Sequence, residues 1–287
     1  MPPAGRITGA GMSYYAKLTV ILIAAFALVA LVLFYFWYES NAVRVVRYKV
    51  KLPEGFRGFR IVQISDLHNH RYGRGQRRLL RLIQAERPDM IAVTGDMIHN
   101  EYTAHALTLA ERAAGLCPVY YVSGNHECIL SFCGEFYAAL RDRGVVVLDN
   151  ESRILTRGGS RIRLIGLSDP MSHEGLSGGR ARRAAAAETL KKLAVGDEFR
   201  LLLSHRPEMF ADYADVDLVL TGHAHAGQVR LPFVGAVFSP GEGFRPRYDV
   251  GRFTEGRTTM IVSGGLGSSN IVPRFNNRPQ LVVIEGE

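Results

Sequence analysis

The chain has 287 residues, of which 47% are hydrophobic and 22% are charged, and its formal net charge is +8. This composition excludes an intrinsically disordered chain and predicts one large folded domain or two small ones. The basic balance suits an anionic substrate, an anionic membrane surface or nucleic acid, and does not choose among them. The three cysteines lack the paired spacing of a disulfide framework.

An uncharged apolar segment lies near the N-terminus. Residues 18–38, LTVILIAAFALVALVLFYFWY, contain no charged side chain, and about 20 apolar residues match the ~30 Å hydrocarbon core of a bilayer. The aromatic residues at 34–38 are typical of a membrane interface. The sequence FYFWYESN at 34–41, where the apolar run ends, offers no small-residue cleavage site. We therefore predict a retained transmembrane helix at 18–38, preceded by a flank at 1–17.

The basic residues around this span bear on its orientation. Two of them, Arg6 and Lys17, precede the span, whereas four follow it closely: Arg44, Arg47, Lys49 and Lys51. The positive-inside rule therefore favours a position on the cytoplasmic face of the cell membrane for the domain that follows the span. The alternative is that the four residues simply belong to the first strand of the following domain.

The remainder of the chain alternates strands with helices. Residues 39–58 predict a juxtamembrane strand and linker, and 59–287 a folded domain. In its first half, apolar strands are expected at 59–65, 88–94, 118–123 and 145–148, with helices at 76–86, 102–114 and 132–143. This rhythm predicts an α/β layered fold with strands buried on both faces.

The second half is richer in strands. They are expected at 153–156, 161–167, 199–204, 217–221, 258–263 and 280–284, with one helix at 180–193. Residues 227–256 contain many Gly, Pro and Arg residues and predict a long excursion beside the functional site. The apolar side chains of this excursion either pack locally or form a flap for an acyl chain.

Polar residues gather where the predicted strands end, which is where α/β sheets bind ligands. They are Asp66, His68, Asp96, Asn125, His126, His205, His223 and His225. A carboxylate and imidazole set without thiolates suits Mn, Fe or Zn, and it is too large for one tetrahedral ion. Two ions about 3.5–4 Å apart can clamp a phosphate and generate hydroxide near neutral pH. An extended chain at TGHAH would point His223 and His225 to the same side.

The ordered blocks DLH, GD, GNHE, H and GHAH resemble the calcineurin-like metallophosphoesterases over residues 59–287. The resemblance implies a four-layer α/β/β/α sandwich. It implies that Asp66, His68 and His225 bind one ion, that Asp96 bridges two ions, and that Asn125, His205 and His223 complete the second site. It also implies that His126 is the catalytic residue that contacts the phosphate or protonates the leaving oxygen.

The apolar N-terminus and the tail RFNNRPQLVVIE resemble a bacterial membrane-anchored subgroup of this family. That subgroup includes UDP-2,3-diacylglucosamine pyrophosphatases of lipid A synthesis and cell-envelope phosphodiesterases. The resemblance implies a membrane-anchored hydrolase with two metal ions that cleaves a phosphodiester or pyrophosphate bond, with a lipid-linked substrate favoured. The alternatives are a nuclease or cyclic-nucleotide phosphodiesterase on the same site, and a weakly catalytic metal-binding scaffold.

Other polar residues near the motifs carry weaker predictions. A basic run beside the first motif is expected to contact substrate or lipid, ahead of nucleic acid, unless it is only a solvated face; it contains Arg71, Arg74, Arg77, Arg78 and Arg81. His70 and His99 are expected to be solvated loop residues. Glu127 is expected to cap the turn that follows it, with orientation of a ligand as the alternative. Asp169 is expected to belong to a turn or to support the site.

Overall fold

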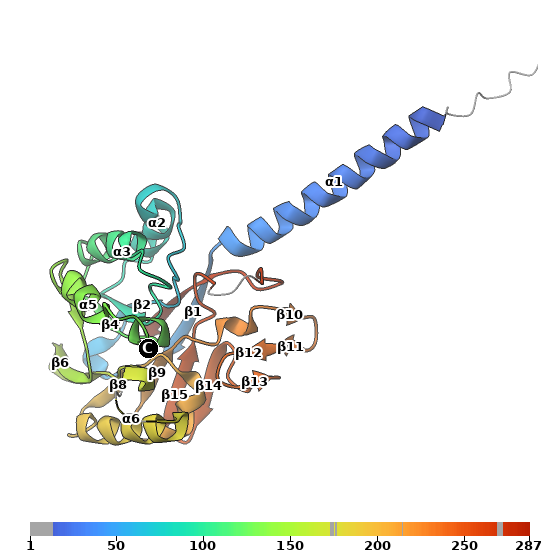
Figure 1. The fold of residues 1–287 in the computed structure, drawn as a ribbon. Coiled ribbons are helices and arrows are strands. Elements are labelled where there is room, and N and C mark those ends of the chain that lie inside the picture. Colours follow the sequence, from blue (N-terminus) through green and yellow to red (C-terminus); the bar gives the residue numbers. More distant parts are fainter. Residues whose placement is uncertain (1–13, 173–174, 176, 214, 269–271) are drawn as a thin grey trace, which may run out of the picture. The chain divides into compact units, whose positions relative to one another are not determined.

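The computed structural model describes residues 14–172, 175, 177–213, 215–268 and 272–287, so most of the predicted flank at 1–17 lies outside the described residues. The chain divides into two compact units, residues 1–38 and 39–287 (Figure 1). Helix α1 (Tyr14–Asn41) has 28 residues and a mean hydropathy of 2.9 over its most apolar window. Its length and composition suit a membrane span, and it runs beyond both predicted ends at 18 and 38.

One six-stranded sheet is built mainly from the first half of the second unit. Its strand order is β1 (Arg44–Val50), β16 (Gln280–Gly286), β2 (Arg60–Ile64), β3 (Met90–Thr94), β4 (Val119–Val122) and β5 (Val145–Val147). Strands β2 to β5 run parallel, whereas β16 is antiparallel to β2 and parallel to β1. Helices α2 (Arg77–Ala85), α3 (Ala104–Ala114) and α5 (Cys133–Arg141) connect the parallel strands.

A second six-stranded sheet follows. Its order is β14 (Gly251–Glu255), β15 (Thr258–Val262), β9 (Leu218–Thr221), β8 (Phe199–Leu203), β7 (Ser160–Gly166) and β6 (Glu151–Arg157). The four central strands are parallel, and the two edge strands are antiparallel to their neighbours. Helix α6 (Gly179–Leu193) packs against this sheet through Ala186 and Leu190.

Hydrophobic cores separate four layers among the described residues. In β2, Val62 and Ile64 pack against the helices of the first half, whereas Ile61 packs between the two sheets with residues such as Leu164 and Leu203. This alternation follows from the two-residue period of a strand, and each face is buried. A third core joins the second sheet to α6. The predicted four-layer α/β/β/α sandwich is therefore confirmed.

The excursion at 227–256 differs in detail from the prediction. It contains two short hairpins, β10 (Arg230–Leu231) with β11 (Gly235–Ala236) and β12 (Phe238–Ser239) with β13 (Gly243–Phe244). It also contains the edge strand β14, which the sequence did not predict. The remaining short elements are η1 (Glu54–Phe56), η2 (Arg74–Gln76), α4 (Asn125–Cys128), η3 (Pro170–Ser172), η4 (Pro207–Tyr213) and η5 (His225–Gly227).

Candidate metal centre

The carboxyl ends of β2, β3, β4, β8 and β9 bring the candidate residues together. The buried Gln63 side chain donates hydrogen bonds to Thr94 Oγ1 (3.0 Å) and to the Thr221 carbonyl oxygen (2.8 Å), which joins β2 to the neighbouring strand β3 and to the other sheet. The loops are joined in the same way, because Asp66 N donates to Gly95 O at 3.0 Å. The two sheets therefore meet at the edge where the motifs begin.

The backbone at these strand ends is strained. Positive φ angles occur at Asp66 (53°), His68 (45°), Asp96 (54°), His223 (65°) and His225 (49°). L-residues rarely adopt this left-handed region, and such residues cluster at functional sites because the surrounding structure fixes them there. The condition of an extended chain at TGHAH is not met, because β9 ends at Thr221. The two imidazoles enter different groups.

One group contains Asp66, His68 and His225, all buried. The two imidazole Nε2 atoms lie 3.1 Å apart, and His225 Nε2 lies 3.5 Å from Asp66 Oδ1. Three ligand atoms from two separate loops thus converge on one point.

The second group contains Asp96, His205 and His223, also buried. His205 Nε2 lies 3.1 Å from His223 Nδ1 and 3.2 Å from Asp96 Oδ2. His205 donates through Nδ1 to the Thr94 carbonyl oxygen at 2.8 Å when that nitrogen carries the proton. This bond orients the ring so that Nε2 faces the group, as in metal-binding histidines.

Asp96 lies between the two groups. Its Oδ2 is 3.2 Å from His205 Nε2 and 3.6 Å from His68 Nε2, while Oδ1 accepts a hydrogen bond from His126 N at 2.9 Å. A carboxylate held in this orientation can supply one oxygen to cations on both sides. The geometry therefore agrees with the shared role that the resemblance implies for Asp96.

The protonation behaviour of the site fits cations. Burial lowers the pKa of His68, His223 and His225, so these rings are neutral and offer lone pairs. Burial also opposes protonation of His205, but the neighbouring carboxylates, Asp96 first and then Asp66 and Asp169, together raise the pKa of His205 to about 10. A positive charge is therefore strongly favoured between His205 and Asp96, and a divalent ion can supply it in place of the proton.

Asn125 and two loop glycines also suit a site for metal ions. Asn125 Oδ1 is buried and has no hydrogen-bond partner among the described residues, as expected of an amide oxygen available to a metal. A Cβ at Gly124 would collide with Asp96 Oδ1, and one at Gly222 would collide with Ser65 Oγ and Asp66 Oδ2. Glycine is required at both positions so that neighbouring loops can approach each other.

Glu127 combines a cap with the alternative role, support of a candidate ligand. Its buried carboxylate accepts backbone hydrogen bonds from Gly124 (2.8 Å), Asp96 (2.9 Å), Met97 (2.6 Å) and Ile98 (3.2 Å). Burial, and then the charge of Asp96, raises its pKa to about 7. Glu127 therefore caps the turn at Gly124 and also fixes the loop that carries Asp96.

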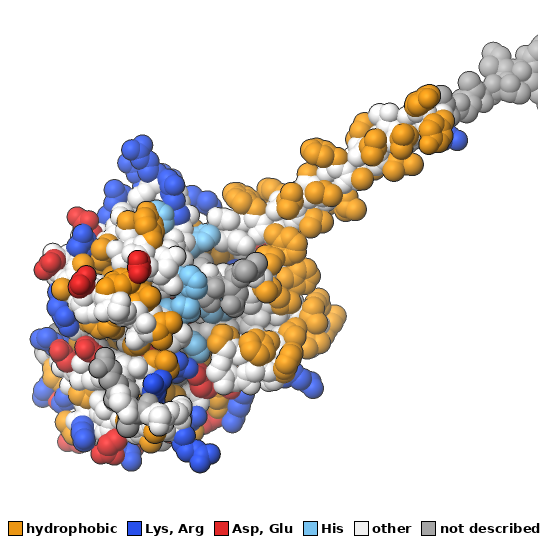
Figure 2. Space-filling view, in the orientation of Figure 1, with side chains coloured by type: hydrophobic (Ala, Val, Ile, Leu, Met, Phe, Trp, Pro, Cys, Tyr) orange, Lys and Arg blue, Asp and Glu red, His pale blue; other side chains and the backbone are white. Residues whose placement is uncertain are grey.

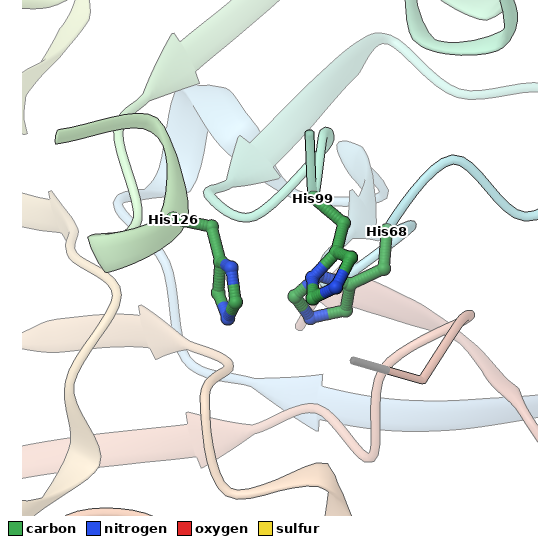
Figure 3. A group of neighbouring side chains, drawn as sticks. All are labelled: His68, His99 and His126. Carbon is green, nitrogen blue, oxygen red and sulfur yellow. The ribbon is translucent and has the colours of Figure 1, made fainter. Parts of the chain in front are cut away.

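Three imidazoles form a further group beside the first one. They belong to His68, His99 and His126 (Figure 3). His126 has a side chain that is 21% exposed, and its Nε2 lies 4.0 Å from Asp96 Oδ2. Its ring centroid is 4.8 Å from that of His68 and 4.9 Å from that of His99. Figure 2 shows histidine side chains gathered at one part of the surface of the second unit.

Two histidines differ from their predicted environments. His99 is exposed as expected, but it faces His126 and His68 and so belongs to the site. The left-handed backbone at Asp96 changes the direction of the chain that leads to His99. The hydrophobic periodicity of the sequence does not indicate this change. His70 is half-buried against Tyr72, and burial followed by the charge of Arg274 lowers its pKa to about 4.

Asp169 is both a turn residue and a support. Its carboxylate accepts a hydrogen bond from Met171 N (2.9 Å) and pairs with the Arg206 guanidinium at 2.6 Å. Arg206 also bonds Glu208 at 3.1 Å, and Glu208 Oε1 lies 4.0 Å from His223 Nε2. Two ion pairs thus lead from Asp169 through Arg206 to Glu208, whose carboxylate lies beside the neutral His223 ring of the second group.

Comparisons with known proteins agree with this arrangement. The calcineurin-like phosphoesterase family matches residues 59–227. The chain is 29% identical to the uncharacterized metallophosphoesterase YkuE of Bacillus subtilis, over 85% of this chain and 86% of the relative. It is 26% identical to the phosphodiesterase YaeI of Escherichia coli, over 87% of this chain and 88% of the relative.

A further relative carries a membrane description in its name. The transmembrane protein with metallophosphoesterase domain of Bos taurus is 27% identical, over 85% of this chain and 56% of that protein. The family match covers more than half of the chain and includes every predicted site residue. The chain therefore belongs to the calcineurin-like phosphoesterase family and is a phosphoric ester hydrolase, as its motifs predicted.

Proposed function

We propose that the protein hydrolyses a phosphodiester or pyrophosphate bond with two divalent transition-metal ions, Mn, Fe or Zn. The observation that supports this most directly is the position of Asp96 Oδ2, which lies within 3.6 Å of imidazole nitrogens from both groups. Mixed carboxylate and imidazole ligands favour these metals over Ca or Mg.

The proposed ligands follow the two groups. Asp66, His68 and His225 hold the first ion, and Asp96 is shared. Asn125, His205 and His223 hold the second ion. When bound, such ions neutralise phosphate oxygens and lower the pKa of water toward neutrality.

The chain's own residues bind and orient the substrate and supply protons. His126 stands beside Asp96 with its ring partly exposed, so we assign it the contact with the phosphate and the proton for the leaving oxygen. The His99 ring centroid lies 4.9 Å from that of His126, and we assign His99 a contact with the same phosphate. Glu127 accepts a hydrogen bond from Asp96 N and thereby holds the Asp96 loop in position beside His126 and His99.

The proposed substrate is lipid-linked, with UDP-2,3-diacylglucosamine as one candidate. This rests on α1, which we propose anchors the chain in the cell membrane and thereby keeps the site near lipid headgroups. We propose that the catalytic domain lies on the cytoplasmic face, because basic residues are concentrated after the span. A reporter fused to the C-terminus that is active only outside the cytoplasm tests the orientation.

The deciding experiment is a metal-reconstituted assay on matched substrates: bis-p-nitrophenyl phosphate, p-nitrophenyl phosphate and a UDP-linked acyl sugar. We expect the diester to be cleaved faster than the monoester, and the acyl sugar fastest. A preference for the monoester would contradict the proposal. Faster cleavage of a cyclic nucleotide or of DNA would favour the alternative substrates, and a fully metallated but inert protein would favour a scaffold.

A further inference from the structure

Two hairpins beside the site expose apolar side chains to solvent. Phe233 at the turn between β10 and β11 is fully exposed, and Phe244 on β13 is 78% exposed. Leu231, Val234 and Phe238 are also exposed. Residues 231–238, LPFVGAVF, contain no charged residue. An exposed apolar patch of this kind marks an interaction surface.

Basic residues border this patch and a second surface of the same unit. Arg245 follows β13 directly and is exposed. The predicted basic run also has exposed members, among them Arg71, Arg77 and Arg81. Figure 2 shows hydrophobic side chains gathered over the hairpins and basic ones over α2. Apolar tips with basic neighbours are complementary to an anionic lipid surface.

Hydrogen bonds join both surfaces to the residues that directly follow the apolar segment. The Glu39 carboxylate accepts a hydrogen bond from Asn277 N, and Asn277 Nδ2 donates to the carbonyl oxygens of His225 (2.8 Å) and Gln228 (3.2 Å), just before β10. On the other side, the Arg78 guanidinium donates to Asn41 O at 3.4 Å. Glu39 is covalently next to Tyr38, where the apolar run ends.

The hairpins also touch the site itself. A Cβ at Gly227, in the turn η5 that carries His225, would collide with Ala236 of β11 and come within 3.0 Å of the Phe238 carbonyl oxygen. The strand β10 begins three residues after that turn. A hairpin tip at the level of lipid headgroups would therefore bring the metal centre close to the same level.

We propose that the hairpins of residues 230–245 form a second membrane contact, in which Phe233, Val234 and Phe244 insert into the interface of the bilayer and the basic residues bind anionic headgroups. The proposal rests on the proposed membrane anchor. Its consequence for the substrate is that the bond to be cleaved lies in the headgroup region of a lipid, within reach of the site without extraction of the lipid from the bilayer.

The test uses the full chain and intrinsic fluorescence, since Trp37 is its single tryptophan. The double variant Trp37→Phe with Phe233→Trp is reconstituted in phosphatidylcholine and phosphatidylglycerol vesicles whose acyl chains carry bromine near the headgroup. We expect roughly twofold quenching, as for a side chain inserted about 5–10 Å into the interface. A Phe244→Trp variant in the same background should behave alike.

The control is Val195→Trp in the same Trp37→Phe background. Val195 is 55% exposed and lies before β8, at the end of the sheet opposite the site. Equal quenching of Trp at positions 195 and 233 would overturn the proposal. Quenching of wild-type Trp37 without quenching at position 233 would overturn the second contact while the anchor stands.

Two further outcomes are distinguishable. If neither Trp37 nor the tryptophan at position 233 is quenched, both the anchor and the second contact are wrong, although hydrolysis of soluble diesters is unaffected by that result. A shift in the emission at position 233 that depends on protein concentration and not on lipid would identify a second copy of this chain as the occupant, and it would also overturn the proposal.

Discussion

The last strand-end loop, after β9, directly precedes the two hairpins along the chain, yet the strand-end loops and the hairpins are built in opposite ways. The loops are buried, carry positive φ angles at five candidate residues and are held by hydrogen bonds such as those to Glu127. The hairpins have strands of two residues each and expose Phe233 and Phe244. Hydrogen bonds therefore fix the loops that carry the candidate metal ligands, whereas the hairpins present an exposed apolar surface.

The largest expected effect comes from Asp96→Asn in the loops. Loss of the shared carboxylate should cost several kcal/mol of charge stabilisation, which corresponds to roughly 10³-fold in turnover. Steady-state hydrolysis of bis-p-nitrophenyl phosphate, together with metal analysis, measures it. The matched control is Asp89→Asn at the opposite end of β3, where the carboxylate accepts a hydrogen bond from Arg60 N. Equal turnover of the two variants would remove Asp96 from the mechanism.

His126→Gln should reduce turnover by about 10²-fold or more, because a positioned proton donor contributes on that scale. The bound metal should remain unchanged, since His126 is proposed not to be a ligand. His105→Gln, at a half-buried position on α3 outside the candidate site, is the control and should keep wild-type turnover. Loss of metal in His126→Gln would instead make this residue a ligand.

Glu127→Gln should weaken metal binding by about 10–100-fold, as expected of a residue that orients a ligand loop. The amide nitrogen would face backbone N–H groups of residues 96–98 or 124, so about 1–3 kcal/mol of stability should also be lost. Isothermal titration with Mn²⁺ and thermal unfolding measure the two effects. Unchanged metal affinity would reduce Glu127 to a helix cap.

Gly222→Ala should destabilise the fold by about 1–3 kcal/mol, because a methyl group there collides with Ser65 and Asp66. Gly134→Ala on α5 is the control. Apart from its chain neighbours and the backbone of its own helix, no atom of the described residues lies within 4 Å of the position that a Cβ would take there, so the replacement should be neutral or slightly stabilising. Denaturant unfolding compares the two variants. Equal stability would show that the loops can separate without cost.

The smallest effect belongs to the hairpins. Phe233→Ser combined with Val234→Ser should leave hydrolysis of a soluble diester unchanged and lower hydrolysis of a vesicle-borne lipid diester by about 10-fold, in line with the loss of one or two buried apolar side chains. The ratio of the two rates is the measurement. A parallel fall of both rates would indicate damage to the site, and no change in either would separate the hairpins from substrate access.

The fold and the convergence of most candidate site residues could be predicted from the sequence, because both depend on local signals. Buried strands such as β2 and β3 appear as apolar runs, and the candidate ligands follow them directly. The edge strand β14 was missed because alternate residues are half-exposed and its sequence, GRFTE, is largely polar. The hairpins were missed because two-residue strands have no measurable period.

Other misses come from backbone turns that side-chain patterns do not report. The position of His99 beside His126 depends on the left-handed turn at Asp96. The extended chain considered at TGHAH does not form, because β9 ends at Thr221. The loop contacts of Glu127 join positions about 30 residues apart in the chain, and no motif spacing encodes them.

The central claim is that two cations share Asp96, and metal titration of the apo-protein tests it most directly. Increasing Mn²⁺ should restore diester hydrolysis with two equivalents bound per chain, and the Asp96→Asn variant should bind fewer than two at the same concentration. Full activity with one equivalent or none, or an Asp96→Asn variant that still binds two ions and turns over normally, would contradict the account.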